Sequence, residues 1–233
     1  MKKSLLLGLS LSAMLAFSAQ AFSASTSFED PSTASWGNWD RGDADTIYAQ
    51  WETIDGAPYD GSPDVAGSQG YTAAGLVTNN AGGFITGGGL GGNIYSIDTG
   101  DFTAYVGAAS AITGPVTVAL QIATLGTALD TASVMLNDIV ADSITTLFSG
   151  ASGSSWGGDA TESLFIWELT SGLTSYVFDF LATGGHMSLD AVSIDIGAAA
   201  IPTTPSAVPV PAAALLFGPA LLGMVGFRRK LKA

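Results

Sequence analysis

The sequence predicts an all-β protein whose folded part is an antiparallel, jelly-roll-like β-sandwich. Several segments alternate between apolar and polar residues with a period of two, which is typical of half-buried strands. Turn-forming Gly, Asp, Ser and Thr residues separate these segments. No long amphipathic helix is evident. Many strands joined by turns favour two packed antiparallel sheets.

The clearest strands lie in the second half of the chain. In the last of them, Val192, Ile194 and Ile196 are expected to face the core, and Ser193 and Asp195 to face outward. Four segments alternate in this way: residues 116–122, 163–169, 176–180 and 187–196. Shorter strands are expected at residues 46–51, 94–97, 102–106, 133–136 and 144–148.

Two further segments have a less definite pattern. Residues 127–142 have some helical spacing, but their Val, Ile and Thr content makes strands equally compatible. Residues 82–92 are rich in glycine and suggest a loop with a short strand. No helix pattern follows them, so they do not match a phosphate-binding loop.

The N-terminal residues have the composition of a secretory signal peptide. Two lysines precede an uncharged apolar run over residues 5–17, and Ala19 and Ala21 are small residues of the kind that signal peptidase accepts. The run is shorter than the about 20 apolar residues of a membrane-spanning helix. We therefore expect signal peptidase to remove residues 1–21, so that the mature chain begins at Phe22.

The remaining body, residues 22–196, is strongly acidic and is expected to form one domain. The chain has no cysteine, which excludes disulfides, thiolate metal sites and a cysteine nucleophile. Six of the seven Lys and Arg residues lie near the chain ends, so Arg41 alone stands against 20 acidic residues and leaves the body a net charge of −19. Such a surface repels nucleic acid and anionic lipids and favours divalent cations.

The C-terminal part contains a second apolar segment. Residues 197–207 are rich in Pro, Thr and Ala, which is typical of an extended linker. Residues 212–227 are uncharged and would form a helix about 24 Å long, shorter than the ~30 Å hydrocarbon layer of a membrane. The basic end, residues 228–233, is expected to stay in the cytoplasm. These features predict a marginal transmembrane anchor that halts export.

The proline motif, the apolar segment and the basic end together resemble the PEP-CTERM sorting tail, here residues 208–233. The name-giving motif has Glu where this chain has Val210. In that family an exosortase in the inner membrane recognises and cleaves near the proline motif. The resemblance implies that the recognition site is Val208, Pro209, Val210 and Pro211, and that the membrane stop is Arg228, Arg229 and Lys230.

The same resemblance implies a setting. Proteins with this tail occur in Gram-negative bacteria that make extracellular polysaccharide or biofilm. The chain would be exported across the inner membrane, held there transiently, and then released to the outer surface or the extracellular matrix. Its expected partners are signal peptidase, an exosortase-like membrane protease and exopolysaccharide. An ordinary C-terminal membrane anchor is the alternative interpretation of the tail.

The body offers few residues for catalysis. His186 is the only histidine, and the sequence indicates no Ser or Asp partner for it. Glu162 and Glu168 would lie roughly 20 Å apart along one strand, too far for the paired carboxylates of a glycosidase. We therefore predict a protein that is not an enzyme and has no catalytic residues, with an extracellular hydrolase as one alternative.

Calcium, as a structural ion, is the cofactor that the acidic body favours, because Ca²⁺ takes several hard oxygen ligands. Residues 40–45 carry alternating acids and an Arg-Gly-Asp triplet, but lack the Gly and distal Glu of an EF-hand loop. The segments around Glu29 and Asp190 resemble the first and last strands of carbohydrate-binding jelly rolls. The resemblance implies that Glu29 and Asp190 hold a structural Ca²⁺, whereas solvated surface carboxylates are the alternative.

Three tryptophans, Trp36, Trp39 and Trp51, form a candidate glycan platform, because aromatic faces stack on sugars; tryptophan in a β-sandwich is also a common core residue. The sequence therefore supports two main hypotheses. The first is a structural or adhesive protein of a biofilm or exopolysaccharide matrix. The second is a carbohydrate-binding module with a defined glycan site.

Overall fold

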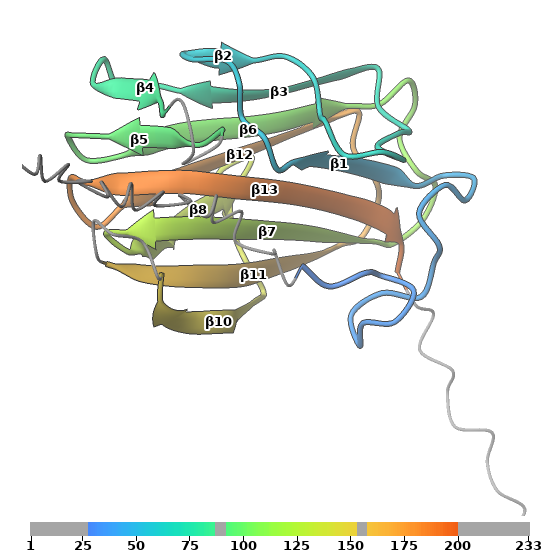
Figure 1. The fold of residues 1–233 in the computed structure, drawn as a ribbon. Coiled ribbons are helices and arrows are strands. Elements are labelled where there is room, and N and C mark those ends of the chain that lie inside the picture. The colour runs from blue at the N-terminus through green and yellow to red at the C-terminus, as the bar shows by residue number, and fades with distance from the viewer. Residues whose placement is uncertain (1–27, 87–91, 153–157, 200–233) are drawn as a thin grey trace, which may run out of the picture. The chain divides into compact units, whose positions relative to one another are not determined.

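The computed structural model describes residues 28–86, 92–152 and 158–199. Within these ranges the chain forms 13 strands and no helix, arranged as two antiparallel sheets that pack face to face (Figure 1). The prediction of an all-β sandwich is confirmed. Sequence predictions for the signal peptide (Ala19, Ala21), the proline motif (Val208–Pro211) and the basic end (Arg228–Lys230) lie outside the described residues.

Sheet A has seven strands, of which β13 lies near the centre. It pairs with β7 along one side, and with β5 and β1 along the other. The strands of sheet A are β10 (Ser143–Ala151), β11 (Asp159–Leu169), β7 (Val116–Gly126), β13 (Met187–Ala198), β5 (Ile94–Ser96), β4 (Gly83–Ile85) and β1 (Ile47–Trp51).

Sheet B has six strands, and β6 and β12 form its centre. Its strands, in spatial order, are β2 (Tyr59–Asp60), β3 (Ala73–Thr78), β6 (Asp101–Gly107), β12 (Ser175–Ala182), β8 (Leu129–Leu136) and β9 (Ile139–Val140). The segment with ambiguous periodicity, residues 127–142, therefore forms strands. All nine strands predicted with definite ranges are present, with boundaries shifted by a few residues.

The core lies between the two sheets and is built from the apolar residues that the alternation assigned to it. The edge-on contact between Trp167 of sheet A and Phe178 of sheet B, with ring centroids 5.6 Å apart, joins the sheets. Phe102 and Phe180 stack within sheet B at 5.5 Å. Trp51 and Trp167 are among the largest fully buried side chains. Burial of such aromatic side chains stabilises a fold of this size without disulfides.

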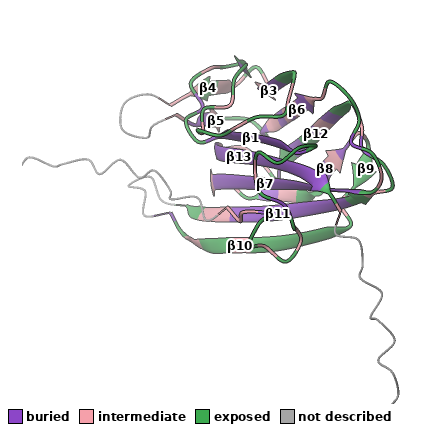
Figure 2. Cartoon of the chain, turned by 90° about the vertical axis from the view of Figure 1, so that its right-hand side faces the viewer, coloured by how far each residue is buried: buried purple, intermediate pink, exposed green. Residues whose placement is uncertain are grey.

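The outer face of sheet A, turned away from sheet B, differs from the expected solvent-facing surface. Ser193 and Asp195 were predicted to face outward into water, yet both are 0% exposed. The chain before β1 covers them: Trp36 packs on a small apolar cluster of Ala119, Leu164 and Ile166 that is separate from the main core. Figure 2 shows β7 and β13 buried and β10 exposed. The expected half-exposure of β7 and β13 is therefore wrong.

Two compact units are distinguished along the chain, residues 1–200 and residues 201–233. The boundary follows β13, the last strand of the sandwich, and falls within the predicted linker 197–207. In the part of the chain that the structure describes, no helix is long and apolar enough to cross a membrane.

Candidate functional site

Arg41 forms the strongest polar contact of the outer face of sheet A. Its Nε and Nη2 donate to the two carboxylate oxygens of Asp195 at 2.7 and 2.8 Å. Its guanidinium also lies 3.9 Å from the ring centroid of Tyr48 and 3.5 Å from a carboxylate oxygen of Asp30. Paired N–H donors on one carboxylate are the strongest form of ion pair in proteins. Arg41 thus fastens the segment before β1 to the central strand.

The charges of this pair depend on each other because Asp195 is fully buried and Arg41 is half-buried. Burial alone would lower the pKa of Arg41, but the hydrogen bonds and charge of Asp195 outweigh it and raise that pKa above its usual value. Burial also raises the pKa of Tyr48 to about 12. Since Arg41 is committed to Asp195, the Arg-Gly-Asp triplet does not present a free arginine for adhesion.

Glu29 lies in the segment before β1, residues 28–46, which we call the covering segment. Its backbone N–H donates to the Gln121 side-chain carbonyl at 2.7 Å, and the Gln121 amide donates back to the Glu29 carbonyl at 3.0 Å. The Glu29 carboxylate accepts a hydrogen bond from the indole N–H of Trp36 at 2.7 Å. These contacts give Glu29 a structural role: it helps to seat the covering segment on β7.

Asp190 lies at a β-bulge of β13, between Leu189 and Ala191, and is only 8% exposed. Burial raises its pKa to about 6, the hydrogen bond with Asn93 opposes that rise, and the charges of Glu162 and Glu52 add to it. Asp190 is therefore a carboxylate at a site that disfavours its charge. A divalent cation or a proton would relieve that cost.

The structure does not bring Glu29 and Asp190 together as a ligand pair. Glu29 lies beside Gln121, whose partner on β13 is Ser193, and Asp190 precedes Ser193 by three residues, about 10 Å along the strand. β1, and not the segment around Glu29, pairs with β13. Among the residues described, no group of three His, Cys, Asp or Glu side chains is arranged to hold a metal ion. Calcium binding remains a prediction.

The predicted tryptophan platform does not fit the structure. Trp51 is 0% exposed in the main core, and Trp39, which is part of the covering segment and lies against Gly197 of β13, is 7% exposed. Trp36 is half-buried, packs against Trp39 at 5.8 Å and donates its N–H to Glu29. Trp39 and Trp51 therefore have no ring face available to a sugar, because packing a β-sandwich uses the largest apolar side chains.

An exposed and a half-buried tyrosine meet instead on the outer face of sheet B. The hydroxyls of Tyr59 and Tyr105 lie 3.0 Å apart, and this contact raises the pKa of Tyr105. Gly75 lies beneath them: a Cβ there would come within 2.7 Å of both rings. Beside the pair, Thr103 donates to Asp179 at 2.6 Å. The period of two over residues 102–106 is a signal that could have placed Tyr105 on the outer face, but Tyr59 is far from it in sequence.

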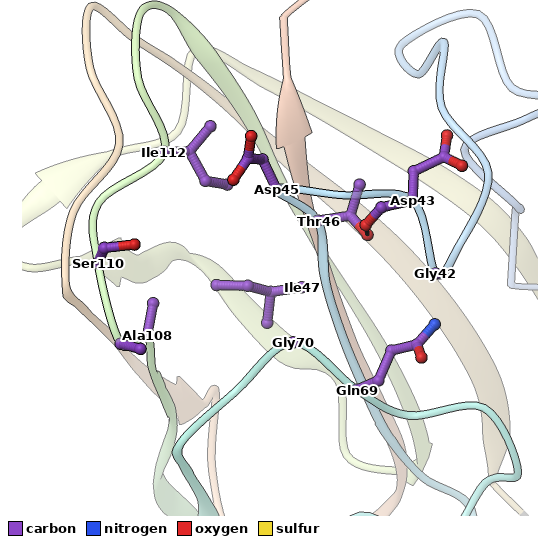
Figure 3. A pocket seen from close by; sticks show the side chains of 11 residues that line it. Gly42, Asp43, Asp45, Thr46, Ile47, Gln69, Gly70, Ala108, Ser110 and Ile112 are labelled. Atoms are coloured by element: carbon purple, nitrogen blue, oxygen red, sulfur yellow. Dashed lines mark hydrogen bonds between the residues drawn. The ribbon is translucent and has the colours of Figure 1, made fainter.

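A polar pocket of about 310 Å³ opens near the start of β1 (Figure 3). Asp43 and Asp45 from the loop before β1, Gln69 and Ser110 supply its polar side chains, and Ile112 supplies an apolar wall. Figure 3 shows the two carboxylates pointing to different sides of the pocket. The pocket therefore presents separate acceptors and lacks the converging carboxylates that a Ca²⁺ site needs.

The residues considered for catalysis are dispersed. Tyr95 Oη lies 2.6 Å from His186 Nδ1, and His186 has a positive φ of 65° at the turn before β13. Glu168 accepts from Thr117 near one end of β11, whereas Glu162 is near Asp190 toward the other end. The absence of catalytic function stays a prediction.

Comparisons of the chain with protein-family models, with curated proteins and with solved structures found no match. The class defined by the fold is a cysteine-free, acidic, all-β sandwich.

Proposed function

We propose that this chain is an exported protein of the cell surface or extracellular matrix, sorted by an exosortase-like protease, with a structural or adhesive role and no catalytic one. The observation that carries the proposal is the order of the parts. The last strand, β13, ends at Ala198, and the linker, the Val208–Pro211 motif, the apolar segment and the basic end follow it. Removing the tail at the motif would take away no described strand.

The finer fold assignment is part of the proposal. We assign the sandwich to the jelly-roll type because the chain repeatedly changes sheet between consecutive strands. Examples are the steps from β5 to β6, β6 to β7, β7 to β8 and β11 to β12. Crossed connections of this kind separate jelly rolls from simple meanders.

The body suits work outside the cell. It has no cysteine to oxidise, and its net charge of −19 keeps copies soluble while attracting divalent cations. Calcium bridging between this surface and acidic polysaccharide is the interaction that we infer from the charge. Asp190 is a described carboxylate with an electrostatic reason to take a cation, because burial and the charges of Glu162 and Glu52 disfavour its own charge.

The intact mass of the mature protein recovered from the producing cells tests the sorting proposal. The wild-type chain should lack residues 1–21 and the tail beyond the motif. A variant with Pro209→Ala and Pro211→Ala should keep the tail and stay in the inner membrane. Its matched control carries Pro202→Ala and Pro205→Ala in the linker and should be processed normally. Recovery of the full chain with both ends from the cytoplasm would overturn the proposal.

A second candidate function, a carbohydrate-binding module, is favoured by the contact between exposed Tyr59 and half-buried Tyr105 on sheet B. Exposed aromatic rings beside hydrogen-bonding side chains suit sugar faces and hydroxyls. Saturable binding of one oligosaccharide, measured by calorimetry, should be lost in Tyr105→Ala. It should persist in Phe84→Ala, an exposed aromatic of sheet A. Equal loss in both variants would reject the tyrosine site.

A further inference from the structure

β10 forms one lateral edge of sheet A. It pairs with β11 along one side, and no other strand of the described chain pairs along its other side. Its nine residues, Ser143–Ala151, are mostly exposed, as the green strand in Figure 2 shows. At about 3.3 Å per residue this edge is roughly 30 Å long. An edge strand presents a row of unpaired backbone N–H and C=O groups.

Apolar side chains border this edge. Ile144 and Phe148 on β10 are 49% and 43% exposed. Ile139 and Val140 of β9, at the end of sheet B and two residues before β10, are 47% and 63% exposed. The Ile139 carbonyl accepts the indole N–H of Trp167 at 2.9 Å, which fixes β9 against sheet A. Backbone groups available for pairing and exposed apolar side chains therefore meet along one side of the sandwich.

Few of the devices that protect edge strands are present on β10. The strand contains no Lys, Arg, Asp, Glu or Pro. Asp142, just before it, accepts the backbone N–H of Glu168 on β11, which turns that carboxylate toward sheet A. One protective feature remains, a bulge between Thr146 and Phe148 in the ladder with β11. The regular section Ser143–Thr146 lies next to the exposed residues of β9.

We propose that β10 pairs antiparallel with β10 of a second copy of this chain, along Ser143–Thr146, and joins two sheets A into one continuous sheet. The pairing makes the protein self-associating through backbone hydrogen bonds, with Val140 and Ile144 of both copies covering each other. This inference rests on the proposed matrix role, because it supplies the cohesion that a structural protein needs.

The distribution of charge favours a second copy of this chain as the partner of the β10 edge. The body carries −19, so two copies repel each other over most approaches. The β10 strand carries no charged side chain, which weakens like-charge repulsion between two copies that meet along it. An antiparallel edge is also self-complementary, since a two-fold axis brings the same strand of both copies together. A basic partner would be drawn to the acidic faces, and an anionic glycan has no backbone to extend a sheet.

Cysteine cross-linking tests the contact directly, because the natural chain has no cysteine. Full-length chains with Ile144→Cys, Thr145→Cys or Thr146→Cys, oxidised in intact cells, should give a covalent dimer on non-reducing gels for at least one position. Opposed residues in an antiparallel pair have Cβ atoms about 5 Å apart, close to disulfide reach. Ile97→Cys is the matched control: Ile97 is 52% exposed and follows β5, near the opposite edge. It should give no dimer.

A second measurement separates edge pairing from calcium bridging. Sedimentation velocity of the purified full chain should show self-association that Ile144→Glu weakens about tenfold or more, and that Ile97→Glu leaves unchanged. More salt should strengthen the association by screening like charges, and a chelator should leave it intact. Association abolished by the chelator, or cysteines on β10 that cross-link no more than Ile97→Cys, would overturn the proposal. Processing and surface location are tested independently of this association, by the intact mass of the mature protein recovered from the cells.

Discussion

Replacing Asp190 tests quantitatively how much the burial of a charged carboxylate on the outer face of sheet A costs in stability. The perturbation is Asp190→Asn, which keeps the size of the side chain and a polar group facing Asn93. Folding raises the pKa of Asp190 from 3.8 to about 6, chiefly through burial. At about 1.4 kcal/mol per pKa unit, this rise corresponds to roughly 3 kcal/mol of folding free energy.

The sign follows from which state holds the proton more tightly. The folded state binds it more tightly than the unfolded chain, so this stabilising contribution is present below about pH 4 and is lost as pH rises through about 6. At neutral pH and above, wild-type Asp190 is charged at a site that disfavours the charge. Asp190→Asn should then raise the free energy of unfolding by up to roughly 3 kcal/mol, and should have little effect at about pH 4.

The assay is urea unfolding followed by tryptophan fluorescence, which the buried Trp51 and Trp167 should make sensitive to unfolding. Measurements run across this pH range with chelator present. Asp98→Asn, at an exposed acid, is the control and should change stability little. A less stable Asp190→Asn at about pH 8 would refute the reasoning. Added Ca²⁺ extends the test: if Asp190 is a ligand, the ion should stabilise wild type and leave the variant unchanged.

Three further expectations concern stability. Arg41→Met should cost about 3 kcal/mol in urea unfolding because it leaves the buried Asp195 carboxylate unpaired, and adding Asp195→Asn should recover much of the loss. Trp167→Phe should cost about 1 kcal/mol more than Trp51→Phe, because the Trp167 N–H donates to Ile139 whereas the Trp51 N–H has no partner among the described residues; equal costs would contradict this. A chelator should lower the melting temperature if a structural Ca²⁺ is bound, and an unchanged melting temperature would contradict calcium binding.

Alternation located nine of the strands, because the core between the sheets imposes a period of two on strands that line it, but it missed β2 (Tyr59–Asp60) and β3 (Ala73–Thr78). Alternation could not show whether the polar residues on the other face of a strand are exposed to water or covered by another polar segment. Ser193 and Asp195 alternate as solvent-facing residues do, yet the segment before β1 buries them. One feature of the sequence indicated this buried contact. Arg41 is the sole Lys or Arg of the body, and a single cation among 20 acidic residues is expected to form an ion pair.

The candidate sites were harder to predict, because they depend on which strands become neighbours. Glu29 and Asp190 both lie on the outer face of sheet A, but the register of β7 and β13 keeps them apart. Tyr59 and Tyr105 meet because β3 lies between their strands and has Gly75 beneath the rings. Residue type made the tryptophans candidates for sugar stacking, with a core position as the alternative. Trp51 occupies the core, where it is among the largest fully buried side chains.

The strand order also gives a physical reason for a tail that would hold the chain at the membrane until folding is complete. β13 is the last of the described strands along the chain, and it lies between β7 and β1, with Ile196 opposite Ile47. Sheet A and the Arg41–Asp195 pair therefore form only after the whole body has emerged, because each joins residues from both ends of it. A weak anchor that halts export beyond a linker would keep β13 on the outer side of the membrane until this closure is complete. Cleavage near Val208–Pro211 would then release a finished sandwich, which is the order of events that the proposed sorting route requires.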